Sequence, residues 1–490
     1  MPPAVPEPDA EVLVVGAGPV GCWLAAELCA AGVDARVIEA REGRAAWSRG
    51  FIVHPRTLEI LDSRGVARHL VDAGRRSPTW HFAMGTRRLD FSVLPTAFPF
   101  VLIQPQARTE ELLEEHLVAH GGSVRRGLRA VGLTQHADRV SVRVAEDGAE
   151  HTLTARYVVG CDGAHSAIRE AAGIGFTGNP DSLSSPSALV VLADPPPPEL
   201  YMQTREQGVF FVIPLPHGRF VVSTIDHAAM HEVEVPWTAE MLRASVIRIT
   251  GTDYGMQEPE RISTLGNSAK QAHRYRDRRV LLAGDAAHVH FPMGGQGMNL
   301  GIQDAHNLAW RLADAVRAER SGGPVPEELL DGYEAERRPV GERVLEDVRA
   351  QMALVAASGA DGTALRSRFE ALLGGHPEVN LQYAMRLSGL DVRYPGPEAE
   401  DPRLGVRIPD LLLDLPGGAA HLYELLREFG AGRFVQLSVG AAAADADGAA
   451  IAAAAVLGPD SALRAGWGRA ETITIRPDGH VALVRPARIA

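Results

Sequence analysis

The sequence predicts an α/β protein of two or three domains that begins with a nucleotide-binding βαβ unit. A chain of 490 residues is longer than one hydrophobic core usually organises. Its first forty or so residues read as a strand, a glycine-rich turn, a helix and a second strand. Short β-rich runs then fill the middle of the chain, and the α/β pattern returns after residue 280. The first domain is therefore expected to be discontinuous.

The first element is the apolar run Glu11–Val15, which predicts a buried strand. The turn Gly16-Ala-Gly18-Pro-Val-Gly21 follows, and Cys22–Ala31 has the apolar periodicity of a helix. A second strand, Ala35–Ile38, ends at Glu39, roughly twenty residues beyond the glycines. This is the fingerprint of a dinucleotide site, because the glycines let a pyrophosphate approach the helix N-terminus and the carboxylate accepts hydrogen bonds from a ribose diol.

Three short β-rich runs after residue 185 predict a sheet platform, with a proline-rich break at Pro195–Pro198 between the first two. The predicted strands are Ala188–Leu192, Val209–Leu215 and Phe220–Ile225. A buried strand at Val280–Ala283 and a long helix from Gly297 towards Val316 then restore the α/β pattern.

The chain changes character again after about Pro395, which indicates a third domain. This part contains an alanine-rich tract, Ala441–Ala455. Thr472–Arg476 and Val481–Arg485 flank the turn Pro477-Asp478-Gly479, and this pattern predicts a β-hairpin.

Composition narrows the function classes. A net charge of −12 argues against a nucleic-acid partner, which normally requires a basic face, so a small-molecule substrate is expected. The N-terminus has no signal-peptide pattern and no stretch is apolar enough to span a membrane, so a cytoplasmic protein is expected. The three cysteines have no zinc spacing, and Lys270 is the only lysine, which leaves little room for a lysine nucleophile.

Two further motifs follow predicted strands. Cys161-Asp162-Gly163-Ala164-His165-Ser166 comes after the apolar strand Tyr157–Gly160, with Arg169 one turn later. Gly284-Asp285-Ala286-Ala287-His288 comes after the strand at Val280, and the glycine-rich run Pro292-Met-Gly294-Gly295-Gln296-Gly297-Met298-Asn299 opens the long helix. Asp285 is placed to accept hydrogen bonds from a polyol, and helix N-terminal amides face whatever lies in the loop.

The ordered set of three motifs resembles the class A, single-component FAD-dependent monooxygenases. This is the superfamily of para-hydroxybenzoate and phenol hydroxylases, and the resemblance is to its branch of aromatic polyketide hydroxylases. It runs from about Glu11 to Arg338. It implies noncovalent FAD and no metal, NADPH or NADH as transient co-substrate, and O2, with oxygen transferred from a C4a-hydroperoxyflavin to an aromatic ring.

The resemblance also implies site residues. Arg49 matches the family arginine that lies near the flavin, and Gln106 matches the glutamine that contacts the ribityl or pyrophosphate portion. Asp162 resembles the family aspartate that takes part in both FAD and nicotinamide binding. Arg49, Pro292 and Gly295 are expected at the reacting end of the flavin, where Pro292 has no N–H to compete for hydrogen bonds. The expected cofactor-binding residues are Gly16, Gly18, Pro19, Val20, Gly21, Glu39, Ala40, Arg41, Arg49, Gln106, Asp162, Gly163, Gly284, Asp285, Pro292, Gly294, Gly295, Gln296, Gly297, Met298 and Asn299.

The chain departs from the family pattern at two places. Relatives often carry arginine directly after the ribose-binding glutamate, but here Ala40 follows Glu39, so an adenine contact must be lost or moved to Arg41. The C-terminal part resembles a thioredoxin-like appendage but contains no cysteine, so it cannot perform dithiol chemistry.

The expected architecture has three parts. Residues 1–176 and 263–395 form a discontinuous, Rossmann-type FAD-binding domain, and residues 177–262 form a substrate-binding sheet with contributions from about 75–103. Residues 396–490 form the thioredoxin-like domain. The resemblance leaves open a monomer or a homodimer, without nucleic-acid or membrane partners.

Several activities share this fold. A flavin halogenase would need a lysine near the FAD domain and a Trp-x-Trp-x-Ile-Pro segment, but the comparable strand reads Phe210-Phe211-Val212-Ile213-Pro214. A Baeyer–Villiger or epoxidising monooxygenase, an FAD-dependent dehydrogenase or reductase, and a noncatalytic flavin-binding protein remain alternatives to the hydroxylase.

By resemblance the expected substrate is a polycyclic, polyketide-type phenol of antibiotic or secondary metabolism. Side chains alternate along Val209–Leu215, so Phe210, Val212 and Pro214 share one face while Phe211 and Ile213 share the other. We expect the first set to line the substrate pocket with Trp80, Phe82 and Pro292. A histidine or ordered water would take the phenol proton.

Overall fold

The described part of the chain covers most of the sequence in this computed structural model. The described residues are 8–44, 50–198, 201–231, 233–395, 401–415, 417–439, 449–453, 455–457, 466–467 and 471–486. The predicted Arg49 site and most of the alanine-rich tract at 441–455 lie outside the described residues.

The βαβ unit predicted from the glycine motif is confirmed. β1 (Ala10–Val15) pairs in parallel with β2 (Ala35–Glu39) on one side and with β11 (Ala149–Gly160) on the other. Helix α1 (Pro19–Ala30) begins three residues before the predicted helix, because proline has no N–H to lose at a first helical position.

Strands from distant parts of the chain complete the same sheet. β20 (Val280–Leu282) pairs in parallel with β11, so residues after the middle sheet return to the first domain. The remaining strands are β8 (Val124–Arg126), β9 (Arg129–Gln135), β10 (Val140–Glu146) and β19 (Arg276–Asp277). The strand order β19-β20-β11-β1-β2-β8 brings the carboxyl ends of β1, β11 and β20, after which the three motifs follow, to one edge of the sheet.

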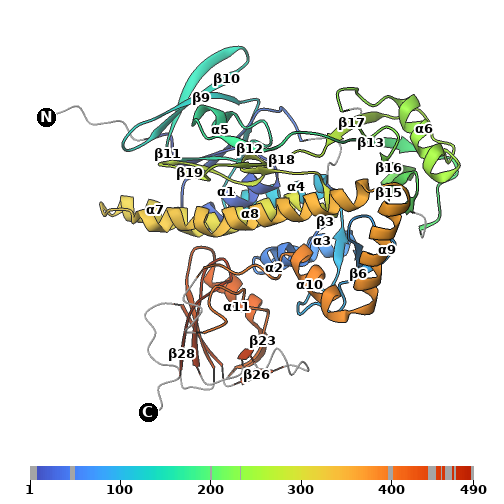
Figure 1. The fold of residues 1–490 in the computed structure, drawn as a ribbon. Helices are drawn as coiled ribbons and strands as arrows, with labels where there is room; N and C mark the ends of the chain where they lie inside the picture. Colours follow the sequence, from blue (N-terminus) through green and yellow to red (C-terminus); the bar gives the residue numbers. More distant parts are fainter. Residues whose placement is uncertain are drawn as a thin grey trace.

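Helices cover this sheet and connect it to the rest of the molecule (Figure 1). α1 packs against α4 (Gln106–Ala119) and α7 (Gly297–Arg320), and α7 in turn packs against α8 (Glu327–Ala356). Figure 1 shows α7 and α8 as two long helices running side by side beneath the sheet. Shorter elements of this part are α2 (Pro55–Asp62), α3 (Ala67–Ala73), α5 (Ala167–Ala171), β12 (Phe176–Asn179), β18 (Ala269–Ala272), β21 (His288–Val289) and two 3-10 turns, η3 (Gly284–Ala286) and η4 (Met293–Gly295).

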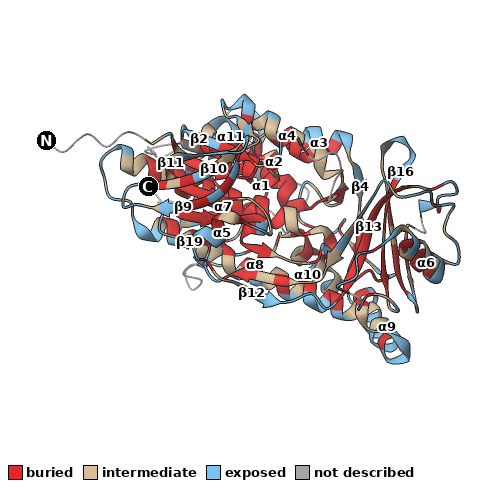
Figure 2. Ribbon diagram, turned by 90° about the horizontal axis from the view of Figure 1, so that it is seen from above, coloured by how far each residue is buried: buried red, intermediate tan, exposed pale blue. Residues whose placement is uncertain are grey.

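The three strands predicted for the middle domain are confirmed as parts of an antiparallel sheet in the order β14-β15-β16-β13-β17. Its strands are β13 (Ser184–Val191), β14 (Met202–Arg205), β15 (Gly208–Pro214), β16 (Arg219–Asp226) and β17 (Arg261–Gly266). Helix α6 (Ala239–Thr250) covers one face of this sheet, and Figure 2 shows the buried strands between α6 and the rest of the molecule.

The other face of the middle sheet meets a second layer. This layer is made of α9 (Gly359–Gly375), α10 (Pro377–Ser388) and the short strands β3 (Ile52–Val53), β4 (Arg75–Ser77), β5 (Thr79–His81), β6 (Arg88–Asp90) and β7 (Val101–Ile103). The 3-10 turn η2 (Pro216–Gly218) connects β15 and β16. Apolar side chains from residues 80–101, from β15 and β16 and from α8 and α10 form one core cluster there. Residues 80–101 thus pack against the middle sheet. The domain limits, including the contribution of about 75–103, stay a prediction.

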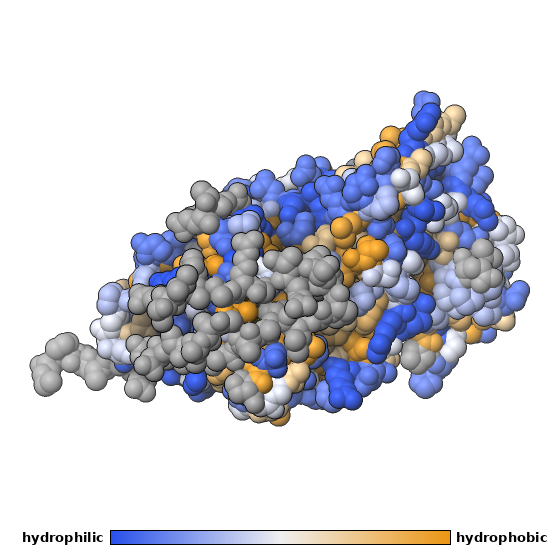
Figure 3. Space-filling view, turned by 90° about the horizontal axis from the view of Figure 1, so that it is seen from below, coloured by the Kyte–Doolittle hydropathy of each residue, from blue (hydrophilic) through white to orange (hydrophobic). Residues whose placement is uncertain are grey.

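The C-terminal part has its own apolar core and lies on the side of α7 and α8 opposite the first sheet (Figure 1). Its described elements are β22 (Leu412–Leu415), β23 (Gly418–His421), α11 (Leu422–Phe429), β24 (Val435–Val439), β25 (Ala449–Ala453), β26 (Ala455–Leu457), β27 (Glu471–Ile475) and β28 (Val481–Pro486). β27 and β28 form the predicted hairpin. The thioredoxin-like assignment stays a prediction. Seen from the side of this part, hydrophilic side chains predominate among the coloured residues (Figure 3).

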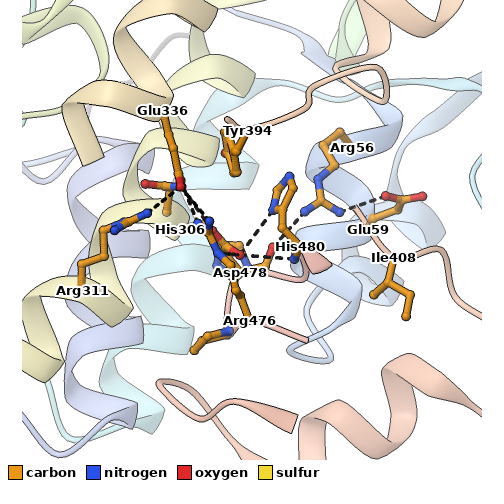
Figure 4. A network of polar contacts seen from close by, with 12 residues as sticks. Arg56, Glu59, His306, Arg311, Glu336, Tyr394, Ile408, Arg476, Asp478 and His480 are labelled. Carbon is orange, nitrogen blue, oxygen red and sulfur yellow. Dashed lines mark hydrogen bonds and ion pairs between the residues drawn. The ribbon is translucent and has the colours of Figure 1, made fainter. Parts of the chain in front are cut away.

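The turn of that hairpin attaches the C-terminal part to the first domain through buried charges (Figure 4). Asp478 is 1% exposed and lies 2.5 Å from a guanidinium nitrogen of Arg476. Its carboxylate also accepts a hydrogen bond from Asn307 on α7, and its carbonyl accepts one from Arg56 on α2. Arg476 in turn forms an ion pair with Glu336 on α8 at 2.7 Å. The hairpin is therefore fixed to α2, α7 and α8 at once.

No helix among the described residues has the length and apolarity needed to cross a membrane.

Candidate active site

The glycine motif forms one wall of a large cavity at the carboxyl edge of the first sheet. Gly16 has φ +107°, and a Cβ there would lie 2.4 Å from the carbonyl oxygen of Cys161 on the neighbouring strand. A Cβ on Gly21 would lie 1.9 Å from the carbonyl oxygen of Gly16, so neither position tolerates another residue. Gly18, in contrast, has open space beside it. The first and third glycines are needed for packing, whereas Gly18 leaves the cavity clear at the N-terminus of α1.

This cofactor cavity has an empty volume of ≈ 1450 Å³, its open mouth included. It is lined by Val15, Gly16, Gly18, Pro19, Val20, Glu39, Ala40, Arg41, Gln106, Glu110, Leu128, Arg129, Ala130, Cys161, Asp162, Gly163, His165, Ala167, Ala283, Asp285, Gly297 and Met298. All three motifs contribute to it. The N-terminus of α1 can bind phosphates and the carboxylates can accept hydrogen bonds from sugar hydroxyls, so the lining fits an extended dinucleotide.

Glu39 is held in its ionised form. Its carboxylate accepts hydrogen bonds from the backbone N–H of Ala17 at 3.0 Å and of Arg41 at 2.9 Å, and from the Arg41 guanidinium at 3.0 Å. Burial opposes the charge, but these hydrogen bonds and the positive charge of Arg41 lower the pKa of Glu39 overall. The carboxylate is therefore a strong acceptor for a ribose diol, and Arg41 lines the cavity beside it.

Gln106 lies at the N-terminus of α4 and reaches the cavity. Its side-chain amide donates to Glu110 at 2.7 Å, and its backbone N–H donates to the carbonyl of Gly50 at 2.9 Å. Arg108, two residues further along α4, forms an ion pair with Glu111 and does not line the cavity.

Asp162 lines the cavity and also caps a helix. One carboxylate oxygen lies 2.5 Å from the Ser166 hydroxyl, and the other accepts the backbone N–H of Ile168 at 3.1 Å. Burial raises the pKa of Asp162. Arg169 donates to the carbonyls of Ala164 and Ala286, so it ties the second motif to the third.

Asp285 reaches into the cavity from the turn after β20, and its side chain is exposed there. Asp304 of α7 holds this turn in place through hydrogen bonds. Asp304 accepts hydrogen bonds from the Gly284 N–H at 3.2 Å, from His288 at 2.6 Å and from Arg337 at 2.8 Å, and it is fully buried with both partners. This support was missed by sequence reasoning, since a single aspartate within a long helix carries no local signal.

The glycine-rich loop before α7 is folded tightly. Gly294 and Gly295 have φ +72° and +76°, and a Cβ on Gly295 would lie 2.5 Å from the Cβ of Ile52. Asn299 donates to the carbonyls of Ile52 at 2.9 Å and Gly295 at 2.8 Å, and it accepts from the N–H of His54 at 2.8 Å. Asn299 therefore holds the loop in place and does not line the cofactor cavity.

Of the loop residues predicted to bind the cofactor, Gly297 and Met298 line the cofactor cavity. Pro292 and Gly295 line a second cavity instead, so the loop separates the two spaces. Gln296 borders a small void beside α10, and its side-chain nitrogen has no hydrogen-bond partner among the described residues.

The second cavity lies between the loop and the middle sheet and has an empty volume of ≈ 770 Å³, its mouth included. It is lined by Gly50, Phe51, Ile52, Trp80, His81, Met84, Ser187, Val209, Phe211, Ile213, Val221, Ser223, Thr224, Ile225, Leu265, Phe291, Pro292 and Gly295. Trp80 and Pro292 line this cavity, and their contact with a substrate stays a prediction.

The predicted face of β15 is wrong. Phe210 and Val212 are buried on the opposite face, in the core cluster that packs against α6, and Phe210 stacks on Tyr254. Val209, Phe211 and Ile213 face the cavity. The reason is that α6 takes the Phe210 face, and strand alternation alone does not tell which face a helix will cover.

Two other predicted substrate residues lie outside this cavity. Pro214 does not line it. Phe82 is buried against α9 and α10, where it packs on Phe369 and Tyr383. Phe82 belongs to the same core cluster as the cavity-lining residues Trp80 and Met84.

Comparisons with known proteins agree with this geometry. The FAD binding domain family matches residues 9–348. The chain belongs to the single-component FAD-dependent monooxygenase family. The monooxygenase is 42% identical to an uncharacterised aromatic compound monooxygenase, YhjG, of Bacillus subtilis, over 96% of this chain and 93% of the relative.

Two solved structures show the same fold along nearly the whole chain. The anhydrotetracycline hydroxylase OxyS from Streptomyces rimosus has a TM-score of 0.86 and 36% identity, and the match covers 97% of this chain and 96% of OxyS. CabE, an aromatic hydroxylase from angucycline biosynthesis, has a TM-score of 0.85 and 36% identity over 98% of this chain and 97% of CabE. This chain is thus an enzyme, an FAD-dependent monooxygenase.

Proposed function

We propose that this monooxygenase hydroxylates an uncharged polycyclic phenol with O2 and NADPH or NADH in secondary metabolism. The observation that carries this proposal is the apolar cavity that adjoins the cofactor cavity at the Pro292–Gly297 loop. Its walls are mostly aliphatic and aromatic, as in sites that bind flat aromatic ligands. The tetracycline and angucycline activities of OxyS and CabE support the choice of a multi-ring substrate.

The chain positions substrate and cofactor on the two sides of one loop. Gly16–Pro19, Glu39, Asp162 and Asp285 would hold the FAD, which when bound passes electrons from the nicotinamide to O2 and transfers one oxygen atom to the ring. Gly297 and Met298 at the N-terminus of α7 direct the positive end of the helix dipole towards the cofactor cavity, where it stabilises negative charge.

The apolar walls exclude water from the reacting edge. Phe211 on one side and Phe291 and Pro292 on the other present hydrocarbon to the substrate, and Pro292 has no N–H that would draw water into the cavity. The overall reaction is ArH + O2 + NAD(P)H + H⁺ → ArOH + H2O + NAD(P)⁺. We also assign this activity to the cytoplasm.

Isotope labelling tests the proposal. Purified holoenzyme is incubated with NADPH or NADH, ¹⁸O2 and a panel of neutral two- to four-ring phenols. Substrate-dependent NAD(P)H oxidation with one ¹⁸O in a new phenol group is the expected result. A lactone or an epoxide with one ¹⁸O would identify the Baeyer–Villiger or epoxidising alternative, and an oxidised product without ¹⁸O would identify a dehydrogenase.

A further inference from the structure

The second cavity has no charged side chain in its described lining. The polar side chains there belong to Trp80, His81, Ser187, Ser223 and Thr224. Two of the hydroxyls already have partners: Ser223 donates to the carbonyl of Pro186 in the sheet at 2.7 Å, and the Thr224 hydroxyl lies 2.8 Å from that of Ser245 on α6. His81 is the titratable side chain in this lining, and it is 2% exposed.

The His81 ring is fixed between two aromatic side chains. Its centroid lies 5.0 Å from that of Trp80 and 6.4 Å from that of Phe211 across the cavity wall. Its Nδ1 accepts the backbone N–H of Met84 at 3.4 Å. A ring nitrogen that accepts carries no proton, so the proton of the neutral ring is on Nε2.

The turn that provides this N–H is held in an unfavourable backbone conformation. Ala83 and Met84 have φ +49° and +53°, and two consecutive left-handed residues other than glycine cost energy. Gln351 of α8 accepts the Ala83 N–H at 3.0 Å, and Thr204 of β14 donates to the Met84 carbonyl at 2.5 Å. Two elements, α8 and β14, therefore keep the turn in place, and the turn keeps His81 in one orientation.

The Nε2 atom of His81 has no hydrogen-bond partner in the part of the chain that the structure describes. This atom is also not fully enclosed by the protein. The ring lines the cavity, so this N–H is available to a ligand. Burial, together with the positive charge of Arg88, lowers the pKa of His81 to about 3. The ring is therefore neutral at physiological pH, and Nε2 stays a donor.

We propose that His81 is a positioning residue whose Nε2–H donates a hydrogen bond to a carbonyl oxygen on the edge of a neutral polycyclic substrate. It does not take up the phenol proton. The same uncharged lining rejects carboxylated phenols, because an ionised carboxylate in the cavity would lose its hydration without gaining a cationic partner. This inference depends on the proposed function and defines its substrate class further.

Binding to the oxidised holoenzyme tests it without turnover. The probes are 2-hydroxyfluorenone and 2-hydroxyfluorene, which differ by one carbonyl, and Kd is measured from the change in flavin absorbance. The wild-type protein should bind the ketone about tenfold more tightly, as one hydrogen bond predicts. His81→Phe should reduce this ratio to about one, and His81→Gln, which keeps an N–H near the same place, should retain most of it.

His151→Phe, a matched change on the exposed surface of β11, should leave the ratio at the wild-type value. FAD content and Tm report whether each variant is folded. The wild-type ratio should stay constant from pH 5.5 to 8.5, and 3-hydroxy-2-naphthoate should bind at least about tenfold more weakly than 2-naphthol.

Equal affinity of the wild-type protein for both fluorene probes, or an unchanged ratio in a folded His81→Phe variant, would overturn the assignment of His81. The assignment would also be overturned if the affinity ratio of the two fluorene probes changed with pH with a midpoint between pH 6 and 7. If the wild-type protein binds none of the neutral phenols, the proposed function itself fails.

Discussion

Two buried regions of this monooxygenase differ in whether they contain charged side chains. The interface around the C-terminal hairpin is rich in buried arginines and carboxylates (Figure 4), whereas the second cavity has a charge-free described lining. At the interface each charge finds its partner when the chain folds, so hydrogen bonds offset the cost of desolvation. The cavity must accept a ligand that is absent during folding, and an unpaired charge there would be costly.

The interface charges form a connected set. Glu336 pairs with Arg311 and Arg476, each at 2.7 Å, and Glu59 pairs with Arg407 at 2.9 Å and Arg56 at 3.1 Å. Burial opposes the charge on Asp478, but Arg476 and His480 hold the pKa of its carboxyl well below the usual range. Such a set specifies one docking position, because a shifted hairpin would leave several charges buried without partners.

The largest effect is expected at the centre of this interface. Asp478→Ala leaves Arg476 without a close partner from its own turn, and breaking a buried pair costs about 3–5 kcal/mol. The free energy of unfolding in urea measures this loss. Asp34→Ala, which removes an exposed ion pair with Arg36, is the control and should cost less than about 1 kcal/mol. A similar small loss for Asp478→Ala would mean that the charges do not hold the hairpin.

The two faces of β15 provide the next contrast. Phe210→Ala removes a fully buried ring from the α6 cluster and should cost about 3–5 kcal/mol of unfolding free energy. Phe211→Ala opens the second cavity and should lower this free energy less, while raising the peroxide formed per NAD(P)H oxidised and leaving FAD content unchanged. If Phe210→Ala changed coupling and Phe211→Ala did not, the substrate cavity would lie on the other face.

The cofactor cavity has charged side chains, as the interface does, but it is shaped to bind a ligand, as the second cavity is. Asp285→Ala should weaken FAD binding by about 10- to 100-fold, the effect of losing one or two hydrogen bonds to a charged group, without a comparable loss of stability in the apoprotein. Fluorescence titration of the apoprotein with FAD measures this Kd. Asp138→Ala, at an exposed turn, should retain wild-type affinity.

The smallest effect concerns pH at the interface. Burial lowers the pKa of His480 to about 4, below its value of about 6.5 in an unfolded chain. Between these values the unfolded state binds more protons, so the stability that is present above pH 6.5 is lost as the pH falls towards 4, at up to about 1.4 kcal/mol per pH unit for this residue. Unfolding free energies of the wild-type protein and His480→Asn at pH 7.0, 6.0 and 5.0 should show a shallower dependence in the variant; parallel curves would contradict this.

The local motifs determined a large part of the fold. The turn Gly16–Gly21 requires conformations and close contacts that only glycine allows, and the alternation after Thr472 together with Asp478-Gly479 specifies a hairpin. These features depend on neighbouring residues, so the sequence predicts them directly. Glu39 and Asp285, which the same motifs singled out, line one cavity, and their contacts with FAD stay a prediction.

Tertiary packing alone decided the rest. Alternation along β15 separates Phe210 from Phe211, but the position of α6 determines which of them faces the cavity. Asp304, Arg337 and Asp478 look like surface charges in the sequence, because charged residues on long helices and tight turns usually face solvent. They are buried here because each also has a partner 16, 33 or 171 positions away in the chain, and no local pattern encodes such a separation.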